Sequence, residues 1–145
     1  MQAAIGCAQL EKLGLFIKTR KKNWTVLRKR LSDLSDKFIL PEPTENCDPS
    51  WFGFSLTVKE DSGFTRGRIV SHLEKEGIQT RMLFAGNLIK QPCFDEMRTA
   101  KNGYRVAGDL STTDRIMRDN FWIGVYPGMS REMLEFMADK IHESL

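Results

Sequence analysis

The chain has 145 residues, of which 41% are hydrophobic and 28% are charged, with 22 Lys and Arg against 19 Asp and Glu. This length suits one compact domain, and the composition excludes disordered, collagen-like and low-complexity chains. No apolar run approaches the roughly 18 residues of a membrane-spanning helix, so we expect no membrane insertion.

The positive charge is concentrated in residues 1–40, which hold nine Lys and Arg against three acidic residues. Such a segment is compatible with binding to nucleic acid or to an anionic surface. However, the basic residues lie opposite the leucines of a predicted helix, and no aromatic side chains alternate with them. We therefore expect a solvated helix face and no nucleic acid partner. A non-catalytic module that binds nucleic acid or a protein through this helix is the alternative.

The three cysteines, Cys7, Cys47 and Cys93, are separated by 40 and 46 residues. Their odd number and wide spacing predict neither a disulfide framework nor a zinc site. The two histidines, His72 and His142, show no metal-ligand spacing, and we interpret them as surface or boundary residues. We therefore expect no metal site in the chain and a reducing, cytoplasmic location.

The first predicted element is a long helix over residues 1–36, because apolar residues recur there at steps of three and four from Leu10 to Leu34. Its first turns are rich in small residues, and no capping residue precedes it. We therefore expect a fragment whose helix leads in from a larger protein. Residues 41–50 contain three prolines and predict a loop. This divides the chain into a linking helix over 1–40 and a small C-terminal domain over 41–145.

Residues 41–145 predict a small α+β domain, with three or four mainly antiparallel strands backed by helices and entered by the long helix. Strands are expected over 51–58, 78–84 and 121–126. Helices are expected over 65–76 with Thr65 as its N-cap and Gly77 at its end, over 112–120, and after an N-cap at Ser130. Residues 85–108 are expected to be mostly irregular.

The most site-like stretch runs from Arg81 to Pro92, where a strand end passes into a turn at Gly86 and Asn87. A glycine there lets the backbone approach a ligand closely. Arg81 and Lys90 are suited to an anionic ligand, and Asn87 can both donate and accept hydrogen bonds. An ordinary turn with solvated cations is the alternative. The chain shows no glycine-rich nucleotide loop, nucleophile elbow or paired-histidine metal motif.

Several sequence segments, taken together, resemble those of one protein family. Residues 1–13 resemble the last helical stretch of the large domain in the sugar aminotransferase/dehydratase family of fold-type-I pyridoxal phosphate proteins, and residues 121–130 resemble its closing strand, proline and helix. Residues 49–54, 81–92 and 104–114 are similar to the 3-dehydratase branch. That branch acts on CDP-4-keto-6-deoxy-D-glucose in making dideoxysugars for lipopolysaccharide O-antigen.

One departure bears on the choice within the family. Aminotransferase members carry a histidine shortly before a Gln-Pro dipeptide, whereas this chain reads Ile89-Lys90-Gln91-Pro92. The difference favours a dehydratase, and a nucleotide-sugar aminotransferase is the alternative within the family.

The resemblance implies a pyridoxal or pyridoxamine 5'-phosphate cofactor, bound mainly by an upstream large domain that also holds the catalytic base. For this chain it implies substrate binding by Arg81, Gly86, Asn87 and Lys90 with Trp51, no catalytic or cofactor-binding residue, and inactivity alone. An iron–sulfur cluster in the parent enzyme would take no ligand from this chain. The implied partners are a CDP-sugar, a second copy of the parent enzyme and a reductase.

Overall fold

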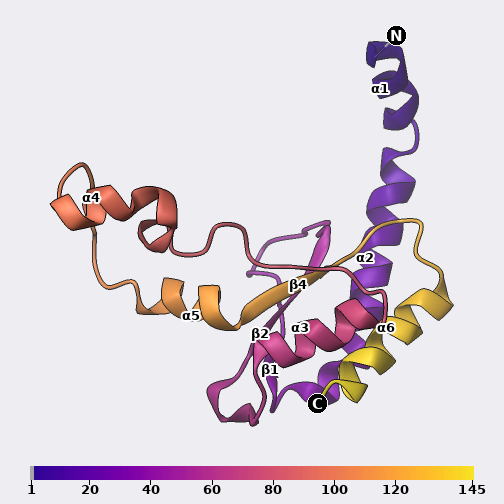
Figure 1. Cartoon of the computed structure of the whole chain (residues 1–145). Coiled ribbons are helices and arrows are strands. Elements are labelled where there is room, and N and C mark those ends of the chain that lie inside the picture. The colour runs from indigo at the N-terminus through magenta and orange to yellow at the C-terminus, as the bar shows by residue number, and fades with distance from the viewer. Residues whose placement is uncertain (1) are drawn as a thin grey trace.

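The computed structural model describes residues 2–145, and its centre is a four-stranded antiparallel sheet (Figure 1). The strands are β1 (Phe38–Ile39), β2 (Gly53–Val58), β3 (Thr80–Arg81) and β4 (Asn120–Gly124), and their order in the sheet is β1-β2-β4-β3. Both central strands carry alternating burial, as the sequence pattern predicts. The expected α+β class with an antiparallel sheet is confirmed.

The hydrophobic core lies between one face of this sheet and three helices, α2 (Leu13–Arg30), α3 (Arg66–Lys75) and α6 (Arg131–Glu143). β2 and β4 pair so that Phe54 lies opposite Ile123 and Leu56 opposite Phe121, and all four side chains are fully buried. The helices contribute the remaining buried side chains, among them Leu27, Leu31, Ile69, Leu73, Leu134 and Ile141. The other face of the sheet carries Ser55, Thr57 and Trp122 and is only partly buried.

The predicted single helix over 1–36 is wrong in two places. It is divided into α1 (Gln2–Leu10) and α2 by a turn at Glu11 and Lys12, and α2 ends at Arg30, followed by a 3₁₀ turn at Ser32–Leu34. α1 has no buried residue, so no tertiary packing stabilises a continuous helix across the turn. Met1, the first residue of that prediction, lies outside the described residues.

Two of the predicted strands differ in extent. The strand expected over 78–84 is reduced to Thr80–Arg81, because only these residues pair with β4 and the chain then turns through Phe84, whose φ is 47°. β4 begins and ends earlier than expected, and the short β1 has no periodicity that could have predicted it. The loop expected over 85–108 holds two 3₁₀ turns, Leu88–Lys90 and Pro92–Phe94, and α4 (Asp95–Ala100).

The predicted residues that begin and end α3 and the residue that begins α6 are confirmed. Thr65 accepts a hydrogen bond from the Arg68 amide, Ser130 accepts one from the Met133 amide, and Gly77 takes the left-handed conformation after α3. α5 (Ser111–Asp119) leads directly into β4. Among residues 2–145, no helix is both long and apolar enough to cross a membrane.

The shape of the molecule is uneven. α1 extends away from the body at the N-terminus, and the segment with α4 projects to the opposite side as an arm that returns through α5 (Figure 1). The segment between β3 and α5 therefore forms this arm, and its first part holds Gly86, Asn87 and Lys90 of the predicted site residues.

Candidate functional site

The turn after β3 is built against α5. Gly86 has a φ of 61°, and a Cβ on this residue would lie 2.7 Å from Cγ of Met117 in α5. Only glycine fits this position without moving the helix, because it tolerates the left-handed backbone and the close approach together. The glycine in the predicted turn therefore allows close packing against α5.

Asn87 and Lys90 meet at one carboxylate. Asn87 is 2% exposed, and its side-chain Nδ2 donates to Oδ1 of Asp114 over 2.7 Å. The Nζ atom of Lys90 lies 2.7 Å from the other oxygen, Oδ2. The hydrogen bonds from Lys90 and Asn87 lower the pKa of Asp114 below its ordinary value. Asp114 is consequently ionised at neutral pH and joins two predicted site residues across two segments.

The other predicted site residues lie apart from this carboxylate. Arg81 is exposed on β3, opposite Trp122 of β4. Trp51 packs against Trp24 of α2, with ring centroids 4.5 Å apart. No hydrogen bond or ion pair between described residues joins Arg81 or Trp51 to the turn. The structure thus brings together Gly86, Asn87 and Lys90 and separates them from the remaining two.

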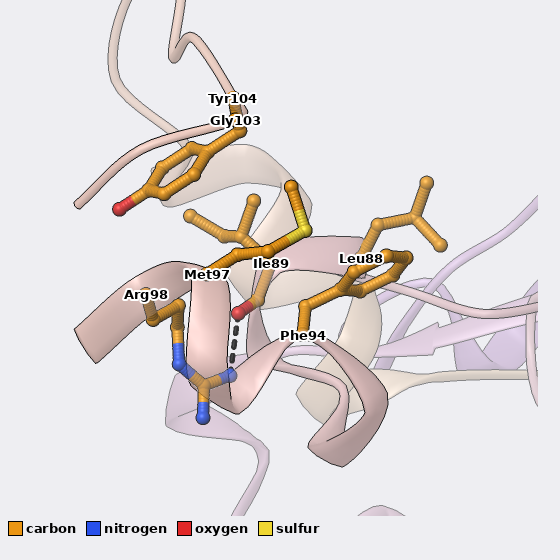
Figure 2. A pocket seen from close by; sticks show the side chains of 7 residues that line it. All are labelled: Leu88, Ile89, Phe94, Met97, Arg98, Gly103 and Tyr104. Carbon is orange, nitrogen blue, oxygen red and sulfur yellow. Dashed lines mark hydrogen bonds between the residues drawn. The ribbon is translucent and has the colours of Figure 1, made fainter. Parts of the chain in front are cut away.

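The arm contains a cavity that sequence reasoning missed. An apolar cavity of about 250 Å³ lies between the 3₁₀ turn that carries Lys90 and the end of α4, and Figure 2 shows the side chains that line it. Its lining residues are Leu88, Ile89, Phe94, Met97, Arg98, Gly103 and Tyr104. Arg98 closes one side and donates to the carbonyl oxygen of Ile89. The apolar residues scattered through the predicted irregular segment were the signal that it folds on itself.

Two arginines near the arm, Arg118 and Arg66, are held by acceptors of neighbouring segments. Arg118 of α5 contacts Glu60 and Asp119, and Arg66 of α3 donates to the carbonyl oxygens of Met117 and Asn120. These contacts fix α5 against the sheet. Since Asp114 and Met117 both lie on α5, the helix holds the turn at two points, one helical turn apart.

Comparison with known proteins identifies the family of this chain. The model of the DegT/DnrJ/EryC1/StrS aminotransferase family matches residues 1–142. The chain belongs to this family. The resemblance seen in residues 1–13, 49–54, 81–92, 104–114 and 121–130 is therefore confirmed.

Curated relatives within the family include sugar 3-dehydratases. The chain is 48% identical over 143 residues to the lipopolysaccharide biosynthesis protein RfbH of Salmonella typhimurium, covering 99% of this chain and 32% of the relative. It is 41% identical over 143 residues to dTDP-4-dehydro-2,6-dideoxy-D-glucose 3-dehydratase of Saccharopolyspora spinosa, covering 99% and 30%. The chain thus spans about a third of the length of the curated relatives it matches.

A solved structure shows the same fold. GDP-4-keto-6-deoxy-D-mannose-3-dehydratase of E. coli, which holds hydrated pyridoxal phosphate, superposes with a TM-score of 0.81 at 26% identity. The match covers 95% of this chain and 34% of that one. The family is accordingly one of enzymes that use pyridoxal or pyridoxamine phosphate, as the resemblance implied.

The residues of this chain do not by themselves fit that cofactor. Fold-type-I sites need a carboxylate for the pyridine nitrogen and a cradle for the phosphate. The buried polar side chains among residues 2–145 are Asn23, Ser62, Thr80, Asn87, Asn120 and Ser144, none of which is acidic. The cavity beside α5 is lined by Glu60 and Asp114 as well as by Arg115 and Arg118, so its charges of opposite sign offset one another and do not form a cradle for the cofactor phosphate.

The described residues also offer no metal cluster. Within residues 2–145, no group of three His, Cys, Asp or Glu side chains is placed to hold a metal ion. The three cysteines are exposed and unpaired.

Proposed function

We propose that this chain forms the small-domain part of a nucleotide-sugar 3-dehydratase, which removes the C3 hydroxyl of CDP-4-keto-6-deoxy-D-glucose in lipopolysaccharide biosynthesis. The observation that carries the proposal is the identity of 48% and 41% over almost the whole chain to RfbH and to a dTDP-sugar 3-dehydratase. The residues before Pro92 support it, since Ile89 and Lys90 stand where aminotransferases of the family carry a histidine.

In this proposal the chain positions the substrate and excludes water. Pyridoxamine phosphate, held by the rest of the enzyme, would supply the electron sink for the loss of the hydroxyl. Lys90 and Arg81 are exposed cations suited to the phosphates of a nucleotide sugar, and Gly86 lets the turn that carries Lys90 pack closely against α5. Asn87 and Trp51 shape the walls. Residues 1–40 link this domain, residues 41–145, to the rest of the enzyme.

The proposed setting is the one that the family resemblance implies. The whole enzyme is a homodimer that receives electrons from a reductase, and it works in the cytoplasm, where exposed Cys7, Cys47 and Cys93 stay reduced. The proposal gives the basic helix α2 no role as a nucleic-acid surface. Three of its seven Lys and Arg, Lys21, Arg28 and Arg30, pair with Asp48, Glu42 and Asp139, which reduces the positive charge of this face.

A nucleotide-sugar aminotransferase is the second candidate. The family model that matches residues 1–142 is itself described as an aminotransferase family. The two activities differ in product: an aminotransferase replaces the 4-keto oxygen with an amino group, whereas the dehydratase loses water from C3.

The test uses the longest reading frame that contains this chain, purified and loaded with pyridoxamine phosphate. It is incubated with the 4-keto-6-deoxy sugars of CDP, dTDP and GDP, and products are followed by mass spectrometry. We expect a CDP-sugar product that lacks one oxygen atom, with one equivalent of pyridoxamine phosphate converted to pyridoxal phosphate and ammonia, and no turnover by the 145-residue chain alone. An amino sugar formed with an amino donor supports the second candidate, and turnover of the GDP- or dTDP-sugar in preference overturns the proposed substrate. Turnover by the isolated chain, or none by the full reading frame, overturns the proposal.

A further inference from the structure

The Asp114 carboxylate on α5 contacts side chains of a different segment through both of its oxygens. It lies in the first turn of α5, where a negative charge is favourable, yet its two oxygens face another segment. Oδ1 accepts from the buried Asn87 amide and Oδ2 from the Lys90 ammonium, each over 2.7 Å. One side chain thereby holds two residues that precede it by 27 and 24 positions.

The chemistry of this contact requires a carboxylate. Asn87 Nδ2 and Lys90 Nζ are both donors, so the group between them must accept at two atoms. An asparagine at position 114 accepts at one atom only and turns an NH₂ group toward the other donor. An alanine leaves the Asn87 amide buried and unpaired, which is costly.

The contact determines the place of the Lys90 ammonium. Lysine is long and flexible, and Lys90 is still 54% exposed, so solvent alone would leave its position undefined. The turn around it is closed by hydrogen bonds from the Lys90 amide to the Asn87 carbonyl oxygen and from Gln91 Nε2 to the Ala85 carbonyl oxygen. Among residues 2–145, Asp114 makes the one polar contact with the end of this side chain, and it leaves ammonium N–H groups free for a second anion.

We propose that Asp114 is a positioning residue, which fixes Asn87 and directs the Lys90 ammonium toward an anionic group of the bound nucleotide sugar. The inference rests on the proposed function, and it explains how the Lys90 ammonium that binds the substrate is held in place. It makes Asp114 act through Lys90, so loss of either side chain removes the same interaction.

The first measurement needs no activity. Amide hydrogen exchange is compared in the full chain for the wild type, Asp114→Asn and Asp109→Asn. Asp109 is the matched control, because it accepts from the Ser111 amide just before α5 and contacts no residue of the turn. We expect exchange at residues 86–91 to accelerate about tenfold in Asp114→Asn, as for loss of one buried hydrogen bond, and to stay unchanged in Asp109→Asn. Unchanged exchange in Asp114→Asn overturns the proposal.

The second measurement separates positioning from a purely structural role. In the full reading frame loaded with cofactor, Asp114→Asn and Lys90→Met should each raise KM about tenfold and change kcat less than twofold, because only substrate binding is weakened. The double variant should be no worse than either single variant, and Asp114→Glu should recover part of the loss. Additive losses, or a normal KM despite faster exchange, overturn the proposal.

The two proposals fail differently. Wild-type enzyme without turnover on any of the three sugars counts against the proposed function, whereas the exchange result is unaffected. Turnover with an unchanged KM in Asp114→Asn counts against the positioning role alone. If Asp114→Asn does not fold, Lys90→Met provides the test, because it removes the ion pair and leaves the Asn87 contact in place.

Discussion

His142 Nε2 lies 3.0 Å from Oδ2 of Asp33, and Nδ1 of the same ring lies 2.8 Å from the carbonyl oxygen of Ala138. Both neighbours accept hydrogen bonds, so the arrangement is complete only when the ring carries both protons. Burial of the ring lowers its pKa, but the two hydrogen bonds and the charges of Asp33 and Asp139 outweigh this and raise the pKa of His142 above 6.5. The contact joins α6 to the turn after α2.

This geometry predicts a loss of stability with rising pH. A histidine whose pKa is raised by folding stabilises the fold fully below its unfolded value near 6.5, and the contribution is lost as the pH rises through the raised value. We expect Tm to fall by about 2 °C between pH 6 and pH 8, a small effect because the pair is partly exposed. His142→Gln should flatten this dependence when Tm is measured by circular dichroism.

The control for this prediction is a neighbouring carboxylate. Asp36 pairs only with the adjacent Lys37, so Asp36→Asn should keep the wild-type pH dependence. Arg30 and Asp139 form a second ion pair beside the histidine, with Nη2 and Oδ1 2.8 Å apart. A dependence that persists in His142→Gln would assign it to another group.

Local chemistry explains which elements of the fold were predictable. The N-caps at Thr65 and Ser130 and the alternation along β2 depend on neighbours within a few residues, and each was correct in type. The end of β3 and the break at Glu11 and Lys12 depend instead on which residues find a partner in the folded chain. Periodicity carries no information about such partners.

The candidate site shows the same limit. Gly86, Asn87 and Lys90 could be predicted together because they lie within five residues of one another around a single predicted turn. The carboxylate that joins them, Asp114, lies on a helix that begins 21 residues after Lys90, and only tertiary packing places it there. Arg81 and Trp51, predicted with them, have their own neighbours on the sheet and on α2. Whether these two contact substrate stays a prediction.

The N-cap of α6 should contribute measurably to stability. Ser130 Oγ accepts from the Met133 amide over 3.3 Å, and the helix it begins carries four buried core residues. Ser130→Ala leaves this amide without its partner, and we expect a loss of about 1 kcal/mol in the free energy of unfolding by urea. Ser71→Ala, an exposed serine inside α3, is the control and should change stability by less than 0.5 kcal/mol, roughly the range for surface substitutions. Equal effects would show that Ser130 does not act as a cap.

Two glycines with positive φ allow the cost of backbone strain to be measured apart from the cost of a steric clash. Gly86 and Gly108 have φ of 61° and 74°, but a Cβ on Gly108 would meet nothing within 4 Å, whereas one on Gly86 would meet Met117. We expect Gly108→Ala to cost about 1 kcal/mol from the backbone alone, and Gly86→Ala about 2–3 kcal/mol in urea unfolding. Met117→Ala added to Gly86→Ala should recover part of the difference. Equal costs at the two glycines would mean that α5 yields easily at this contact.

Gly53 and Gly124 are register partners in β2 and β4, and they differ in what covers them. A Cβ on Gly53 would lie 2.6 Å from Cε3 of Trp122, while one on Gly124 would meet nothing within 4 Å. Gly124→Ala should therefore be neutral or stabilise by up to about 1 kcal/mol, and Gly53→Ala should destabilise by about 1–3 kcal/mol in urea unfolding.

Trp122 also donates from Nε1 to the carbonyl oxygen of Met82 over 3.2 Å, at the start of the turn that carries Asn87. Displacing this ring in Gly53→Ala should also speed amide exchange at residues 82–86. A destabilised variant with normal exchange there would show that the tryptophan supports the sheet without holding the turn.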